Sequence, residues 1–122
     1  MKETEVFAVK TFLNSYPKNR YANFRYMLLE DEKEMKNADQ VTKVKCFGAE
    51  IIREDLDGDC IYARESNRIE CITPYRYKAV QLLKKLFDGC VSPIHLIDIA
   101  GPIVDEWVSD FDLEQASVQN YI

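Results

Sequence analysis

The chain contains one histidine, His95, and an acidic residue, Asp98, follows it by three positions. On a helix this spacing places two side chains on the same face, where the carboxylate could orient the imidazole as in many general-base arrangements. The nucleophile would then be Ser92 or Cys90. Ser92, however, directly precedes Pro93 and suits a helix N-cap, and no motif supplies an oxyanion hole. We therefore favour a structural role for this pair, with a His95- and Asp98-dependent hydrolase or transferase as the alternative.

The last third of the chain is acidic. No Lys or Arg follows Lys85, and residues 86–122 carry a net charge of −7, which leaves +2 on residues 1–85 because the whole chain carries −5. Such a segment repels nucleic acid and favours the basic surfaces of other proteins. A charged helix face is often only a solvated surface, and this is the alternative interpretation. The residues that we predict to bind a partner are Asp105, Glu106, Trp107, Asp110, Asp112 and Glu114.

Cations and aromatic rings alternate in the sequence YPKNRYANFRY, which ends at Tyr26. Aromatic rings on a strand can stack on bases, so a weak single-stranded RNA-binding module that uses Arg25 and Tyr26 is a second alternative function. Phe24 and Tyr26, however, lie on one face of a strand and Arg25 on the other, which is also typical of an ordinary half-buried sheet. We therefore do not expect direct binding to nucleic acid.

No pattern in the sequence predicts a metal or a cofactor. Asp55, Asp57 and Asp59 alternate as at the start of a calcium-binding loop, but Cys60 and Ser66 stand where such loops carry Gly and Glu. A hairpin turn explains the segment better. The four glycines are not clustered, which argues against a glycine-rich nucleotide-binding loop.

The four cysteines include no CxxC pair, and one histidine cannot complete a Cys2His2 zinc site. The first ten residues have no apolar signal core, and no apolar run reaches the roughly 18 residues of a membrane-spanning helix. We therefore expect a cytoplasmic protein that makes no membrane contact. In a reducing compartment we expect free, buried thiols at Cys46, Cys60, Cys71 and Cys90.

The first 73 residues show the alternating pattern of β-strands. The antiparallel meander that they predict has five strands, near residues 4–13, 20–30, 41–54, 60–65 and 69–73. The charged segment 31–40 is predicted as an exposed loop, and residues 55–59 and 66–68 as turns. Gly48 is predicted to mark a β-bulge, because the apolar phase shifts there.

After the last predicted strand the apolar period changes to 3.6, which predicts helices. Thr73 and Pro74 suit the start of a first helix, and Ser92 with the proline after it suits the start of a second. Gly101 and Pro102 are expected to split the second region into helices 93–100 and 102–111, because proline cannot donate to the preceding turn.

These elements predict an α+β fold, in which an antiparallel sheet of about five strands is covered on one face by two or three C-terminal helices. A chain of 122 residues is long enough for one core and too short for two. We therefore expect one domain over residues 1–112 and a C-terminal tail over residues 113–122.

Three segments resemble a family of small intracellular proteins from Gram-positive anaerobes whose activity is not established. Its members have a Tyr-Arg-Tyr-like strand, a glycine followed by an Ile-rich strand, and a closing Ser-Pro-x-His-Leu-x-Asp segment. The matching residues here are Phe24 to Tyr26, Gly48 to Ile52, and Ser92, Pro93, His95, Leu96 and Asp98. The resemblance spans residues 21–107, and the chain departs from it in segment 31–40 and in the acids after residue 107. It implies the fold and an intracellular location, and no particular activity.

Taken together, the residues predict a small acidic binding protein rather than an enzyme. We expect an inhibitor or regulator that docks on the basic, nucleic-acid-handling surface of a protein partner, as anti-CRISPR proteins of phages do. That comparison rests on size and charge alone. We leave open whether the protein forms a homodimer.

Overall fold

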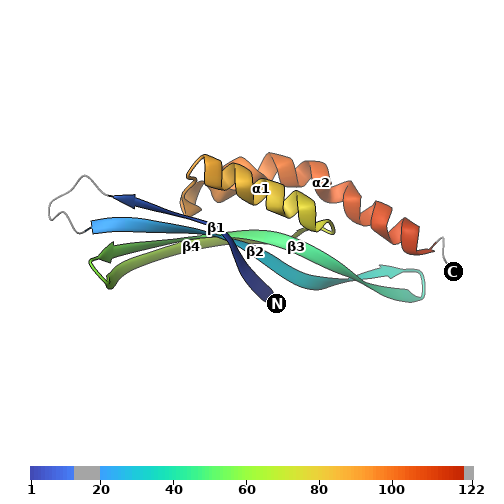
Figure 1. The fold of residues 1–122 in the computed structure, drawn as a ribbon. Helices are drawn as coiled ribbons and strands as arrows, with labels where there is room; N and C mark the ends of the chain where they lie inside the picture. Colours follow the sequence, from blue (N-terminus) through green and yellow to red (C-terminus); the bar gives the residue numbers. More distant parts are fainter. Residues whose placement is uncertain (13–19, 120–122) are drawn as a thin grey trace.

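The computed structural model describes residues 1–12 and 20–119 of the chain. It has an α+β architecture, in which four antiparallel strands form one sheet in the order β1-β2-β3-β4 and the helices lie over one face of that sheet (Figure 1). Within these residues, no helix is long and apolar enough to cross a membrane. The elements are β1 (Lys2–Phe12), β2 (Arg20–Asn37), β3 (Gln40–Asp57), β4 (Cys60–Thr73), α1 (Arg76–Asp88), the 3-10 turn η1 (Pro93–His95) and α2 (Leu96–Gln119).

The described part of the chain has four strands where we expected about five, because the fourth and fifth predicted strands are one. β4 runs without a turn through Ser66, Asn67 and Arg68, each of which pairs with a residue of β3. Asn67, for example, lies opposite Ile51. The side chain of Arg68 also fits the strand, since it makes an ion pair with Glu50 at 3.1 Å. The turn predicted there is wrong.

The charged segment 31–40, predicted as a loop, is the end of a long hairpin. β2 and β3 stay in register as far as Asn37 and Gln40, and the chain reverses through Ala38, which has a positive φ of 54°. Strand pairing is made by the backbone, so a continuous ladder can extend into a segment whose side chains are charged. The prediction of a loop is therefore wrong.

Gly48 lies at a bulge, as predicted. The register of β3 on β4 shifts between Phe47 and Ala49, and a Cβ atom on residue 48 would overlap the carbonyl oxygen of Ile69. Glycine is the residue that permits this close approach of two backbones. The predicted hairpin turn at the far end of β3 is also present, with Gly58 at a φ of 60° in a two-residue loop.

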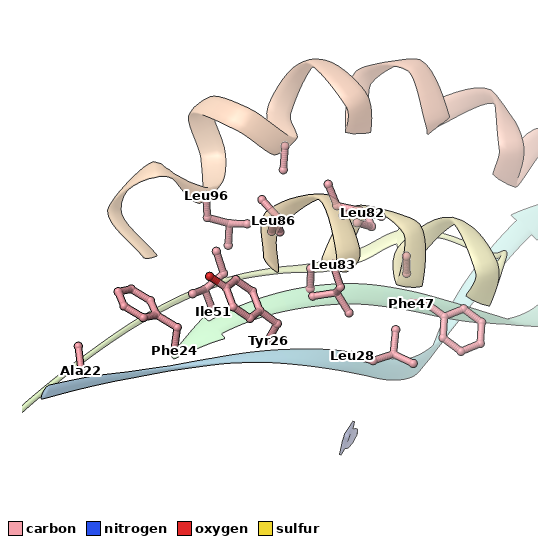
Figure 2. Packing of buried hydrophobic residues seen from close by; sticks show 14 residues of the cluster. Ala22, Phe24, Tyr26, Leu28, Phe47, Ile51, Leu82, Leu83, Leu86 and Leu96 are labelled. Atoms are coloured by element: carbon pink, nitrogen blue, oxygen red, sulfur yellow. The ribbon is translucent and has the colours of Figure 1, made fainter. Parts of the chain in front are cut away.

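The core lies between the sheet and the helices. Alternate residues of β2 point toward the helices, and the fully buried side chains of this layer include Tyr26, Ile51, Leu83, Leu86 and Leu96 (Figure 2). Burial of one such side chain contributes roughly 1.5–3 kcal/mol, so this layer supplies much of the stability. The hydroxyl of Tyr26 donates a hydrogen bond of 3.0 Å to the carbonyl oxygen of Val91, which ties the loop after α1 to β2.

Neither predicted hydroxyl cap is formed. α1 begins at Arg76, and its N-cap residue, Tyr75, makes no side-chain capping bond. Thr73 instead accepts a hydrogen bond of 3.1 Å from the backbone N–H of Tyr75, which turns the chain into the helix. Ser92 has the extended backbone of an N-cap residue before η1, but its side chain also makes no capping bond.

α2 is one continuous helix, although we predicted two short helices with a break at Gly101 and Pro102. The carbonyl oxygen of Asp98 has no proline N–H to accept, but Pro102 is exposed, so water can satisfy that oxygen. Gly101 also lacks the Cβ atom that would crowd the ring of a following proline in a helix. The helix continues to Gln119, past residue 111 where we expected it to end.

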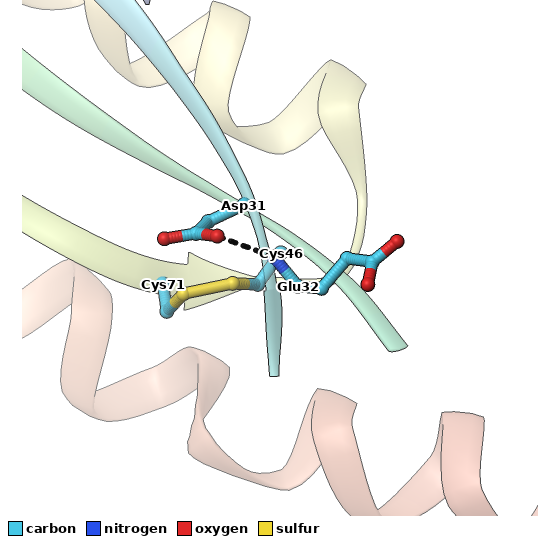
Figure 3. The surroundings of a disulfide bond; sticks show 4 residues. All are labelled: Asp31, Glu32, Cys46 and Cys71. Carbon is cyan, nitrogen blue, oxygen red and sulfur yellow. Dashed lines mark hydrogen bonds between the residues drawn. A yellow bond between two sulfur atoms is a disulfide. The ribbon is translucent and has the colours of Figure 1, made fainter. Parts of the chain in front are cut away.

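Cys46 and Cys71 form a disulfide bond, which corrects the expectation of four free, buried thiols (Figure 3). The bulge between β3 and β4 and a positive φ of 48° at Cys71 bring the two Cα atoms to 4.8 Å, within the range of disulfides. Cys60 and Cys90 are free, as expected, but they are exposed.

Candidate partner-binding surface

Three aspartates form a line along the exposed side of α2. Asp98, Asp105 and Asp112 are spaced by seven residues, which is almost two helical turns, so they project in nearly the same direction about 10.5 Å apart. All three side chains are exposed. We call these three residues the acidic stripe.

Exposed apolar side chains lie next to the acidic stripe. Ile97 and Val108 are 56% and 63% exposed, and their spacing of eleven residues is close to three helical turns. They therefore form a line of their own beside the aspartates. Apolar side chains next to charge are what an interface with another protein uses, since the apolar part is desolvated on binding and the charge sets the orientation.

Asp110 and Trp107, two of the predicted binding residues, point toward α1 instead. Asp110 is 7% exposed, and its carboxylate accepts a hydrogen bond of 2.5 Å from Nζ of Lys78. This bond is the main reason that the pKa of Lys78 is raised. The same ammonium group lies 5.7 Å from the ring centre of Trp107, which is half-buried against the core. Asp110 and Trp107 therefore hold α2 against α1.

Glu106 and Glu114 are the remaining two predicted binding residues, and the structure describes the side chain of Glu106 only. Glu106 is exposed, but it is rotated by about 100° from its neighbour Asp105 and lies to one side of the acidic stripe. Glu114 belongs to α2, and its side chain lies outside the described residues. Among the side chains that the structure describes, the exposed carboxylates of the predicted set are therefore those of Asp105, Glu106 and Asp112.

His95 and Asp98 are not brought together. His95 ends η1 and Asp98 lies in the first turn of α2, and both side chains are exposed. Over residues 1–12 and 20–119, no hydrogen bond or ion pair joins them. The Sγ atom of Cys90 lies 3.9 Å from the hydroxyl of Thr11, and within the described residues no hydrogen bond joins Cys90 to the imidazole. The hydrolase or transferase alternative requires an imidazole that is oriented by the carboxylate of Asp98, and the described residues do not show this arrangement.

Arg25 and Tyr26 lie on opposite faces of β2. The ring of Tyr26 is fully buried, and this burial, with a smaller effect of Cys90, raises the pKa of its hydroxyl. The guanidinium of Arg25 lies on the face away from the helices, where it donates to Glu5 at 2.7 Å and pairs with Glu54 at 3.6 Å. A base could stack on Tyr26 only if the core opened, so these residues do not form one binding surface.

The aspartates of the β3–β4 hairpin are partly neutralised by arginines. Asp55 makes an ion pair with Arg53 at 2.9 Å, and Asp57 lies 3.8 Å from Arg20. In the part of the chain that the structure describes, no three side chains of the metal-binding types are grouped to hold an ion.

The sequence contained a signal for the acidic stripe that the predictions did not use. We related Asp98 to His95 by their spacing of three residues, and the predicted break at Pro102 left Asp98 on a different helix from Asp105. With one continuous helix, the spacing of seven residues is sufficient to align Asp98, Asp105 and Asp112.

Comparison with known proteins identifies the family to which the chain belongs. A family model described as a family of unknown function, DUF6514, matches residues 9–110, which include most of the sheet, α1 and two residues of the acidic stripe. Neither a curated protein nor a solved structure matches the chain. Because the match covers more than half of the sequence, the chain belongs to DUF6514, a family of unknown function.

Proposed function

We propose that this protein is a non-enzymatic binding protein that docks the acidic stripe on a basic surface of a protein partner. The observation that carries the proposal is the alignment of Asp98, Asp105 and Asp112 on the exposed side of α2. No Lys or Arg follows Lys85 in the sequence, so α2 itself contains no cation that could neutralise the stripe. Lys33 of β2 lines the same hollow as Asp112, but among the described residues no ion pair joins the two side chains. The field of these carboxylates can therefore steer and orient a basic partner.

The apolar line beside the acidic stripe supports a folded protein as the partner. Ile97 and Val108 offer surface that only a partner with apolar side chains of its own would cover. A protein that handles nucleic acid combines such side chains with a basic groove for phosphates. The form of the function that we propose is thus a cytoplasmic inhibitor or regulator of such a protein, comparable in size and charge with anti-CRISPR proteins.

A pair of triple variants tests this proposal. The stripe variant carries Asp98→Asn, Asp105→Asn and Asp112→Asn. The control variant has the same net charge as the stripe variant but loses three other exposed carboxylates, two in the sheet and one in the β3–β4 turn, through Glu34→Gln, Glu65→Gln and Asp59→Asn. Each protein is immobilised and exposed to extract of the source cells, and the proteins bound by the wild type are purified for affinity measurements at several salt concentrations.

We expect the control variant to keep the partner and the stripe variant to lose at least about tenfold in affinity, which corresponds to about 1.4 kcal/mol. The affinity of the wild type should fall with added salt, and that of the stripe variant should fall less. Melting curves check that all three proteins are folded. A partner that binds the stripe variant as tightly as the wild type would refute the proposal.

A further inference from the structure

A hollow of about 700 Å³ lies between the start of α1 and β3. We call it the tyrosine hollow, and its lining includes Lys45, Phe47, Arg76, Tyr77 and Val80 together with Tyr75. Sites for small ligands have volumes of roughly 300–1,000 Å³, so the space is sufficient for one ligand of moderate size. The hollow is open to solvent, so a ligand can reach it without any movement of the chain.

The walls of the tyrosine hollow are aromatic. The rings of Tyr75 and Tyr77 are stacked at a centroid distance of 6.0 Å and an angle of 24°. The side chain of Tyr77, in the first turn of α1, is 58% exposed. Phe47 and Val80 add apolar surface to the lining of the hollow. An exposed ring next to an apolar base is the arrangement on which a flat heteroaromatic ring stacks.

The charge of the tyrosine hollow is opposite to that of the chain. Two cations, Lys45 and Arg76, line it, and none of the described residues in its lining is acidic. Among the described residues, no acidic group pairs with Arg76, and Lys45 has only a long contact of 3.5 Å with Glu30. In a protein with a net charge of −5, this is a local concentration of positive charge that attracts an anion.

The start of α1 adds to the attraction for an anion. α1 has 13 residues, no acidic residue in its first turn and no side-chain cap, so its positive end is not neutralised by the helix itself. This contribution supplements the two cations that line the cavity. The combination matches a phosphate group better than it matches a neutral ligand.

We propose that the tyrosine hollow binds a mononucleotide, whose base stacks on Tyr77 and whose phosphate is held by Arg76 and Lys45. A mononucleotide has one base and one phosphate group, which match the exposed ring of Tyr77 and the two cations of the hollow. A polynucleotide would extend beyond the two cations onto a surface whose overall charge is negative. The site is separate from the acidic stripe, because none of the three aspartates of the stripe is among the residues that line the hollow. It does not depend on the proposed function.

A titration followed by NMR tests the inference. Adenosine monophosphate, adenosine and inorganic phosphate are each added to the ¹⁵N-labelled protein at low salt, and a five-nucleotide single-stranded RNA is added in a further experiment. We expect adenosine monophosphate to give saturable shifts of the backbone amides of Arg76 and Tyr77. Adenosine and phosphate alone should bind at least about tenfold more weakly, because each lacks one of the two contacts.

Two variants and two matched controls complete the test. Tyr77→Ala and Arg76→Gln should each weaken binding of adenosine monophosphate by about tenfold. Tyr62→Ala and Arg64→Gln remove an exposed tyrosine and an exposed arginine of β4, outside the hollow, and should leave the affinity unchanged.

Three results would overturn the inference. One is the absence of saturable shifts at the start of α1 with adenosine monophosphate. A second is equal affinity in the hollow and control variants. A third is much tighter binding of the RNA than of the mononucleotide, which would assign the surface to nucleic acid. Melting curves of all four variants establish that a loss of binding is not a loss of folding.

Discussion

Lys78 of α1 and Asp110 of α2 form an ion pair in which Nζ and Oδ2 lie 2.5 Å apart. The two side chains are only 23% and 10% exposed, so the pair is largely shielded from water. It joins the helices on the side of α2 that faces α1, and it therefore helps to determine which side of α2 faces the solvent. The orientation of the acidic stripe thus depends on a contact between two helices.

The first prediction concerns this ion pair. Lys78→Met should lower the free energy of unfolding by about 1–3 kcal/mol, because it leaves a mostly buried carboxylate without its partner. Lys84→Met is the matched control, since Lys84 pairs with Asp88 on the exposed surface of α1 at 3.1 Å and should cost no more than about 0.5 kcal/mol. Urea denaturation measures both values. Equal losses would contradict a special role for the pair between the helices.

The second prediction concerns alkaline pH. Burial raises the pKa of Tyr26 in the folded protein, whereas tyrosines of the unfolded chain ionise near pH 10. The folded state therefore holds this proton when the unfolded state releases it, so the stability contribution is present below about pH 10 and is lost as the pH rises further. Tyr26→Phe should reduce the loss of stability above that pH.

Urea denaturation between neutral and alkaline pH measures this effect. At neutral pH, Tyr26→Phe should cost about 1 kcal/mol, because the hydrogen bond to Val91 is lost. The pKa of Lys78 is also raised, so its ion pair contributes stability that is lost as the pH rises through this range. This loss occurs in both proteins and cancels in the comparison. Tyr62→Phe, at an exposed ring, serves as the control. Parallel loss in the wild type and in Tyr26→Phe would show that Tyr26 titrates normally.

The third prediction concerns the bulge. Gly48→Ala should destabilise the protein by about 1–3 kcal/mol, because the added Cβ would meet the backbone of β4 at Ile69 and the strands would have to separate. Gly89→Ala is the control, since its Cβ would meet Val91 at an ordinary 3.4 Å and its φ is −88°. Thermal melting distinguishes the two. A stable Gly48→Ala protein would show that the strands are not in close contact there.

The fourth prediction concerns the disulfide. In protein purified without reductant, two of the four cysteines, Cys60 and Cys90, should react with a thiol reagent before unfolding. Cys71→Ala should lower stability by about 2–4 kcal/mol, since the bond closes a loop of 25 residues. Reductant should lower the melting temperature of the wild type but not that of Cys71→Ala, with Cys60→Ser as the control. Four reactive thiols in the folded protein would refute the pairing.

Much of the fold could be predicted from local chemistry. The hairpin at Gly58, the bulge at Gly48 and the helices after Thr73 were each marked by a glycine or by a change of apolar period, and these signals do not depend on distant residues. The charged end of the β2–β3 hairpin was not predictable in this way. Its strand structure follows from the ladder that begins in the buried part of the sheet and continues outward.

The candidate surface was predictable only in part, for a geometric reason. The sequence showed that the C-terminal segment was acidic, but the side on which each carboxylate lies depends on the phase of α2. That phase is set by continuity through Pro102 and by Lys78, which precedes Asp110 by 32 residues. Composition therefore identified Asp105 and Asp112 but could not separate them from Asp110.

Every strand of the sheet pairs with its immediate neighbour in the sequence. A meander of this kind closes each loop over a short stretch of chain, which favours rapid folding. During synthesis, the strands can thus assemble before α2 has emerged from the ribosome. We expect the helix that carries the proposed docking residues to be the last element to fold. The protein could then recognise a partner only after the rest of the chain has reached its native structure.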